Sequence, residues 1–193
     1  MGLTLRLCAF ARVSGGQMDE AEIQERAARI KLLLMDCDGV LTDGRIWILE
    51  NGEDQKAFHT RDGLGIVLLH RAGLKSGIIS GRTSSALERR AQSLGVSYLW
   101  QGRDDKRQAF ADTLAQANVT NDQVAFVGDD LTDLPLMGQA GLAVAVADAV
   151  AEVQAHAHYV TKLKGGKGAV REVVELILKA QGRWDDLVKS YLP

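Results

Sequence analysis

The 193-residue sequence lacks several features that would assign it to a specialised class of protein. It has two cysteines, Cys8 and Cys37, which are too few for a disulfide framework. No apolar run approaches the roughly 18 residues that a membrane-spanning helix needs. The net charge of −2 at pH 7 gives no general attraction for nucleic acid or for a membrane surface. We therefore expect a globular, cytoplasmic protein without a nucleic-acid or membrane partner, whose anion sites are built from local basic residues.

Apolar runs and stretches of helix length alternate along the chain from residue 30 onward. Strands are predicted at 30–35, 76–79, 97–99, 124–127, 142–144 and 159–160. Helices are predicted at 19–29, 63–72, 84–94, 104–117, 131–139, 148–155, 169–180 and 184–191. Strands joined by helix-length connections form a parallel sheet with helices on both faces. The predicted fold class is therefore α/β, with a Rossmann-like, doubly wound parallel sheet.

A β-hairpin flap is predicted just after the first strand. Asn51 and Gly52 stand between two short apolar segments, 45–49 and 55–59. Asn-Gly in such a position is a strong hairpin signal. A hairpin over 45–59 would lie above any site at the end of the first strand.

The length suits one domain. We expect an extension with a short helix at 1–29 and a core at 30–182 that includes the flap. A glycine-rich segment and C-terminal helices at 161–193 overlap the end of this core. Three glycines within 165–168 predict either a mobile linker or a loop that another part of the backbone approaches closely.

Two aspartates, Asp36 and Asp38, follow directly on the apolar run 30–35. A buried strand that ends in carboxylates presents them at the edge of the sheet where open α/β folds bind ligands. A carboxylate can attack phosphorus to form an aspartyl-phosphate, which splits one difficult displacement into two easier ones. Because residue i+2 of an extended segment points to the same side as residue i, Asp38 is placed to act as the acid and base. The pair predicts phosphoryl transfer with Asp36 as the nucleophile.

Two further groups supply what such a transfer needs. Ser80 and Gly81 follow the strand at 76–79, where a hydroxyl and backbone N–H groups at a strand-to-helix turn can bind phosphoryl oxygens. Lys106, near the start of its predicted helix, can neutralise charge on the phosphoryl group and on the attacking carboxylate. We assign Ser80, Gly81 and Lys106 to phosphate binding.

A third acidic group follows the strand at 124–127. Oxygen ligands from two strand ends suit Mg²⁺, a hard octahedral ion that keeps some of its waters. The expected ligands are the side chains of Asp36 and Asp129 and the main-chain carbonyl of Asp38. Asp130 and Asp133 are expected to have supporting roles.

Each of these groups alone has a simpler explanation. Asp-x-Asp-Gly is common in turns, Ser-Gly-Arg is common at helix starts, and a single lysine is usually a solvated charge. Their order, and their shared position after apolar strands, favour the catalytic interpretation.

These motifs resemble those of the haloacid dehalogenase superfamily over residues 30–186, with Asp36, Asp38, Ser80, Lys106 and Asp129 at the four motif positions. The chain is similar to the tetrameric branch that has no large cap domain. Segments 38–44, 61–63, 128–131, 146–149 and 165–172 carry that likeness.

The resemblance implies an Mg²⁺-dependent phosphatase for a phosphorylated eight-carbon sugar acid, in a step that supplies lipopolysaccharide precursors. Arg61 and Arg82 are candidates to bind the sugar acid, because guanidinium groups bind carboxylates in a planar fork, and Thr42 is a third candidate. For Arg61, a salt bridge to Asp62 or Glu53 is the alternative.

The resemblance also implies a homotetramer. Its subunits would meet through their flaps, where Trp47, Ile48 and Leu49 supply apolar surface. An ordinary hairpin core within one chain is the alternative. The segment 164–168 resembles a glycine-rich segment that folds over an active site and influences product release.

Three other functions remain open. A phosphatase for a nine-carbon sugar acid 9-phosphate belongs to the same branch, although it tends to have Glu where this chain has Arg82. A receiver-like phosphoacceptor domain also combines carboxylates, a hydroxyl group, a lysine and Mg²⁺. A non-catalytic partner domain is the third alternative, but no motif residue is missing.

Overall fold

A six-stranded parallel sheet forms the centre of the computed structural model, which describes residues 18–103 and 105–192. The strand order is β5–β4–β1–β6–β7–β8. At its centre lie β1 (Leu32–Met35) and β6 (Val124–Gly128), in which every residue is apolar or glycine and buried. The other strands are β4 (Lys75–Ile79), β5 (Tyr98–Trp100), β7 (Leu142–Ala145) and β8 (Tyr159–Val160). The predicted doubly wound α/β fold is confirmed.

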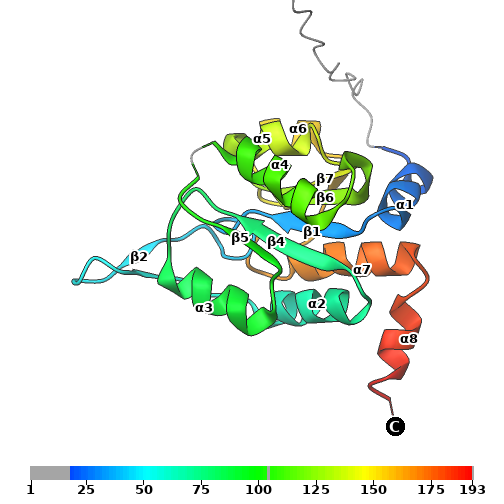
Figure 1. Cartoon of the computed structure of the whole chain (residues 1–193), viewed down its shortest axis with the longest axis horizontal. Coiled ribbons are helices and arrows are strands. Elements are labelled where there is room, and N and C mark those ends of the chain that lie inside the picture. The colour runs from blue at the N-terminus through cyan, green and yellow to red at the C-terminus, as the bar shows by residue number, and fades with distance from the viewer. Residues whose placement is uncertain (1–17, 104, 193) are drawn as a thin grey trace, which may run out of the picture.

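Helices cover both faces of the sheet (Figure 1). On one side lie α4 (Lys106–Ala117), α5 (Leu134–Met137) and α6 (Ala151–His156), and on the other α2 (Thr60–Arg71), α3 (Ser85–Leu94) and α7 (Ala169–Ala180). Helix α7 is contacted by α1 (Glu20–Ala28) and by α8 (Trp184–Lys189). Two 3₁₀ turns flank β6, η1 (Asn121–Gln123) before it and η2 (Leu131–Asp133) after it. Among the described residues, no helix has the length and apolar character that crossing a membrane requires. Residues 1–17, most of the predicted extension, and residue 104 lie outside the described part.

The predicted hairpin is present as β2 (Trp47–Ile48) and β3 (Asp54–Gln55), which pair in antiparallel register. Gly52 adopts a φ of +81° in the turn, a conformation that favours glycine. The hairpin extends away from the body of the molecule, so within one chain its tip does not lie above the site (Figure 1). The apolar side chains of β2 are uncovered within the chain, where Trp47 is 62% and Ile48 73% exposed.

The sheet brings three loops together at its carboxyl edge. Met35, the last residue of β1, is in register with Ile78 of β4 and Val127 of β6. The segments after these three strands therefore emerge side by side. They carry Asp36, Asp38, Ser80, Gly81 and Asp129, whereas Lys106 begins α4 after β5.

The glycine-rich segment 164–168 lies between β8 and α7. Gly165 and Gly166 are buried, and the Gly166 N–H donates to the Val40 carbonyl at 2.9 Å. The alternative of a mobile linker is therefore wrong, because another part of the backbone approaches this segment closely.

Candidate active site

A cavity of about 420 Å³ opens at the carboxyl edge of the sheet, at the end of β1. Its lining combines acidic, basic and hydroxyl groups from these three loops and from Arg103 and Lys106, which follow β5. The lining residues are Asp36, Asp38, Gly44, Ser80, Gly81, Arg82, Arg103, Lys106, Asp129, Asp130 and Thr132. Most of the residues that the sequence analysis selected therefore face one space.

Asp36 and Lys106 form the buried centre of this site. The Lys106 Nζ lies 2.9 Å from Asp36 Oδ2 and 2.8 Å from Asp133 Oδ1. Burial raises the pKa of Asp36 to about 6, the Asp133 carboxylate adds to this rise, and Lys106 opposes it. Burial would lower the pKa of Lys106, but the two carboxylates raise it on balance. Lys106 is therefore a cation held beside the expected nucleophile.

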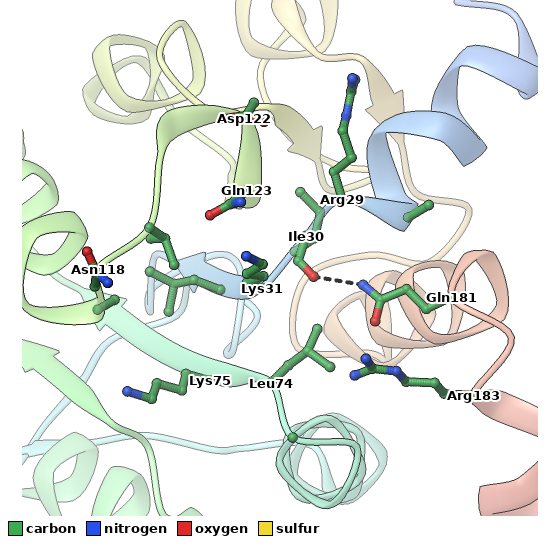
Figure 2. A pocket seen from close by; sticks show the side chains of 15 residues that line it. Arg29, Ile30, Lys31, Leu74, Lys75, Asn118, Asp122, Gln123, Gln181 and Arg183 are labelled. Carbon is green, nitrogen blue, oxygen red and sulfur yellow. Dashed lines mark hydrogen bonds between the residues drawn. The ribbon is translucent and has the colours of Figure 1, made fainter.

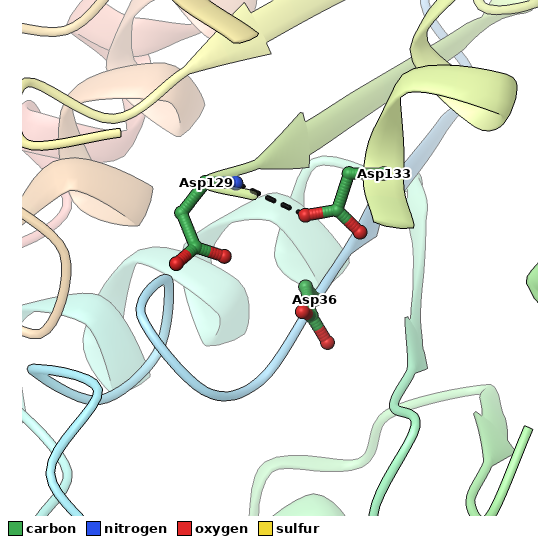
Figure 3. A group of neighbouring side chains, drawn as sticks. All are labelled: Asp36, Asp129 and Asp133. Carbon is green, nitrogen blue, oxygen red and sulfur yellow. Dashed lines mark hydrogen bonds between the residues drawn. The ribbon is translucent and has the colours of Figure 1, made fainter. Parts of the chain in front are cut away.

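Asp129, directly after β6, and Asp133 lie to either side of Asp36 (Figure 3). Burial raises the pKa of Asp129 to about 8, and the carboxylates of Asp133, Asp36 and Asp130 add to the rise. Its buried Oδ1 has no hydrogen-bond partner. A buried carboxylate oxygen without a donor lacks the compensation that burial of a charge requires.

The acidic cluster has the chemistry of a hard-cation site. One carboxylate oxygen from each of Asp36, Asp129 and Asp133 lies within 4.8 Å of the others. Asp133 already accepts hydrogen bonds from Lys106 and from the Asp129 N–H, at 2.8 and 3.0 Å. Asp36 is also engaged, because its Oδ1 accepts from the Cys37 N–H at 2.7 Å and its Oδ2 lies 2.9 Å from Lys106 Nζ. Asp129 is therefore the member of the cluster with a buried oxygen that has no partner. A divalent cation would pair the orphan oxygen of Asp129 and reduce the repulsion among these carboxylates.

A buried lysine beside Asp38 was missed by the sequence analysis. Lys56, just beyond the hairpin, pairs with Asp38 Oδ1 and lies 3.4 Å from Asp54 Oδ2. Its side chain is 1% exposed. The Ser84 hydroxyl donates to Asp54 Oδ1 at 2.8 Å, which extends this network to the start of α3. The base of the hairpin is thereby tied to the expected acid, although the sequence gives no periodic or motif signal for Lys56.

The loop after β4 forms the phosphate side of the cavity. Ser80 is 1% exposed, and its hydroxyl accepts from the Arg82 N–H at 3.3 Å. The Arg82 Nε lies 4.0 Å from Asp38 Oδ2. Arg103, which the sequence analysis did not select, lines the same cavity and places its guanidinium 5.4 Å from the centre of the Trp100 ring. Two arginines therefore face the phosphate-binding candidates.

Two predicted substrate-binding residues do not line the cavity within this chain. Thr42 is buried, and its hydroxyl accepts from the N–H groups of Gly39 and Gly44 at 3.4 and 3.3 Å. These contacts tie the hydroxyl to the loop, and the assignment of Thr42 to substrate binding stays a prediction. Arg61 lies on the exposed surface of α2, which begins three residues earlier than predicted. Within the described part of the chain, Arg61 forms neither of the alternative salt bridges, to Asp62 or to Glu53.

A second, larger cavity of about 750 Å³ lies at the opposite edge of the sheet (Figure 2). Its lining includes Lys31, Lys75 and Arg183 but none of the predicted catalytic residues. Gln181 there donates to the Ile30 carbonyl at 2.7 Å, a contact that holds the end of α7 against the start of β1. Size alone would favour this cavity, but the smaller one holds the carboxylates, the buried lysine and the phosphate-binding candidates.

The fold and the acidic cavity define a class of protein, an α/β protein whose site is equipped for phosphoryl transfer. A family described as haloacid dehalogenase-like hydrolase matches residues 99–173, which contain Lys106, Asp129 and Asp133. Close relatives extend the match to most of the chain. The chain therefore belongs to the haloacid dehalogenase-like hydrolases.

Three relatives are particularly informative. The 3-deoxy-D-manno-octulosonate 8-phosphate phosphatase of Yersinia pestis is 49% identical over 84% of this chain and 87% of its own length. The enzyme of the same name from Escherichia coli K12 is 46% identical over 86% of this chain and 88% of its own length. The phosphatase of this name from Moraxella catarrhalis, solved in complex with a magnesium ion, a phosphate ion and a KDO molecule, is 40% identical. It has a TM-score of 0.87 and covers 90% of this chain and 99% of the solved chain.

Proposed function

We propose that this protein is an Mg²⁺-dependent phosphatase that hydrolyses 3-deoxy-D-manno-octulosonate 8-phosphate to the free sugar acid and phosphate. This step would supply lipopolysaccharide precursors in the cytoplasm. The observation that carries the proposal is the convergence of Asp36, Lys106 and Asp129 on one cavity. The relatives' activity supplies the substrate, because the similarity covers nearly their full length.

In the first step, the Asp36 carboxylate attacks phosphorus and the bond to the sugar oxygen breaks. Asp38 gives its proton to the departing oxygen, which leaves as the alcohol. In the second step, Asp38 takes a proton from water as that water attacks the aspartyl-phosphate. Inorganic phosphate leaves, and Asp36 returns to its carboxylate form.

The nucleophile must be ionised, although burial raises the pKa of Asp36 to about 6. Lys106, 2.9 Å away, favours the charged form. Asp36 and Asp129, with the main-chain carbonyl of Asp38, would hold Mg²⁺. When bound, the ion offsets the repulsion between the carboxylates and the incoming phosphate dianion.

Ser80, Gly81 and Lys106 would bind the transferring phosphoryl group. Ser80 and Gly81 line the cavity on the side of the loop after β4. Lys106 is already between Asp36 and Asp133, so it can neutralise charge that develops in the transition state without moving far.

Arg82 is our candidate for choosing the eight-carbon substrate. It lines the cavity beside Asp38 and is about half exposed, so its guanidinium can reach a carboxylate on a bound sugar acid. Arg61 would act in this way only if a neighbouring subunit brought it to a site. The Arg82→Glu variant should lose more kcat/KM with the eight-carbon sugar phosphate than with a nine-carbon sugar acid 9-phosphate.

The decisive functional experiment compares turnover of these two sugar phosphates in the presence of Mg²⁺. We expect many turnovers and a preference for 3-deoxy-D-manno-octulosonate 8-phosphate. Preference for the nine-carbon substrate would instead identify the protein as a phosphatase for a nine-carbon sugar acid 9-phosphate. A phosphorylated protein that completes no further turnover would instead support a receiver-like domain.

We also propose that the flap is a subunit contact in a homotetramer. A two-stranded hairpin is marginal alone, and the apolar side chains of Ile46, Trp47, Ile48 and Leu49 are exposed on it. Burial of these side chains against other copies would remove this surface from water. The core at 30–182 and the flanking regions at 1–29 and 161–193 remain our proposed domain division.

A further inference from the structure

The backbone of the nucleophile loop, residues 36–44, lies between the cation-site candidate and the glycine loop, residues 164–168. A Cβ added to Gly39 would lie 1.9 Å from Asp129 Oδ2. A Cβ added to Gly165 would lie 1.6 Å from the Gly39 carbonyl oxygen. The Asp129 side chain therefore contacts Gly39, and the backbones of Gly39 and Gly165 are in direct van der Waals contact.

Further contacts hold the later part of the nucleophile loop against the glycine loop. A Cβ added to Gly166 would lie 2.4 Å from the Thr42 carbonyl carbon and 2.5 Å from the Asp43 nitrogen. The Gly166 N–H donates to the Val40 carbonyl at 2.9 Å. The glycine loop thus supports the nucleophile loop along most of its length, and a displacement of one loop must displace the other.

Two carboxylates accept hydrogen bonds from the glycine loop and from the start of α7. Asp62 of α2 is 1% exposed and accepts from the Gly168 and Arg171 N–H groups at 3.1 and 2.9 Å. These are donors at the start of α7, where a negative charge is favourable. Asp148 accepts from the Gly165 N–H at 2.9 Å. The loop is held by side chains that do not line the active-site cavity.

We propose that the glycine loop is a positioning element for the cation site, anchored by Asp62. Asp62 fixes the start of α7, Gly165 then sets the position of Gly39, and Gly39 sets the position of the Asp129 carboxylate. The inference rests on the proposed function, because it assigns the stack a role in Mg²⁺ binding. Asp62 and Gly165 would thus be positioning residues, which act on the cation site through Gly39 and contact neither the ion nor the substrate.

The test uses two variants and one matched control. Gly165→Ala forces the Gly39 carbonyl to move by roughly 2 Å to reach an ordinary contact distance. Asp62→Asn keeps the shape of the side chain but replaces one acceptor oxygen with a donor. Gly182→Ala is the control, because Gly182 has a φ of +66° with nothing within 4 Å of its added Cβ. It introduces backbone strain at the far end of α7 without touching either loop.

Two measurements on the full chain avoid dependence on turnover. The first is the Kd for Mg²⁺ by calorimetry, without substrate. The second is hydrogen exchange of amides 40–44 in the metal-free protein. Gly165→Ala and Asp62→Asn should each weaken Mg²⁺ binding by about tenfold or more, the range seen when support for a metal ligand is removed. Both should also accelerate exchange of these amides, whereas Gly182→Ala should change neither quantity.

Wild-type Mg²⁺ affinity and exchange in Asp62→Asn would overturn the positioning role, and this variant covers the case in which Gly165→Ala does not fold. Weakened binding in Gly182→Ala to the same degree would also overturn it, because general destabilisation would then explain the loss. With either of these two outcomes, the proposed function would still hold as long as the wild type binds Mg²⁺ and hydrolyses the sugar phosphate. A wild type that binds no Mg²⁺ and hydrolyses no sugar phosphate would overturn the proposed function itself.

Discussion

Replacing Asp129 by Asn should stabilise the metal-free protein while removing its response to Mg²⁺. The buried Oδ1 of Asp129 has no hydrogen-bond partner, and three neighbouring carboxylates repel its charge. Asparagine has almost the same shape, so it fits beside Gly39 while the charge is removed. The substitution therefore measures two quantities separately. One is how much the carboxylate destabilises the metal-free protein, and the other is how much it contributes to binding the cation.

The magnitude follows from the pKa of Asp129, which is raised from 3.8 to about 8. Since the folded state holds this proton more tightly than the unfolded state, stability falls as pH rises from about 4 to about 8. A shift of this size corresponds to about 6 kcal/mol at high pH, which screening by solvent at this partly exposed group reduces to on the order of 2–4 kcal/mol. The variant should gain this amount near pH 8 and little near pH 4.

Urea denaturation of both proteins in a chelator, between pH 4 and 8, measures this gain. Burial lowers the pKa of His158 to about 4, so the stability contributed by this residue rises with pH below 6.5 in both proteins and cancels in their difference. Adding Mg²⁺ should stabilise the wild type but hardly affect Asp129→Asn. If the variant were less stable than the wild type without metal, and kept the Mg²⁺ response, the assignment of Asp129 as a cation ligand would be wrong.

Three further predictions concern other parts of the site. Asp36→Asn should abolish phosphate release with an unchanged circular dichroism spectrum, and normal release would refute the nucleophile. Lys56→Met leaves the Asp38 carboxylate without its buried cation, so the variant should lose about 3 kcal/mol of stability and most of its kcat, whereas a matched change at an exposed lysine should not. A double substitution of Trp47 and Ile48 by Ser should convert a tetramer to smaller species in sedimentation, and an unchanged mass would exclude the flap as the contact.

The strand ends could be predicted from the sequence because their signals are local. Asp36 and Asp129 directly follow runs of apolar residues, and parallel strands must end at the same edge of the sheet. This rule places the carboxylates near each other without any knowledge of side-chain contacts. The hairpin was equally accessible, since Asn51 and Gly52 mark its turn.

Contacts between distant parts of the chain could not be predicted in this way. Asp62 and Gly168 are 106 residues apart, and only the packing of α2 against α7 brings them together. Thr42 has the right residue type to bind a substrate, but its hydroxyl turns back to the loop. The surface position of Arg61 follows from the start of α2 at Thr60, a boundary that apolar periodicity does not define sharply.

The most direct test of the central claim is to locate the phosphoryl group during turnover. The wild type is mixed with 3-deoxy-D-manno-octulosonate 8-phosphate and Mg²⁺, stopped with acid within a turnover, and digested for mass spectrometry. Our account predicts a phosphoryl group on the peptide with Asp36 that is lost on base treatment and absent from Asp36→Asn. Turnover in which phosphate is released at the same rate by Asp36→Asn, or a phosphoryl group on another residue, would contradict it.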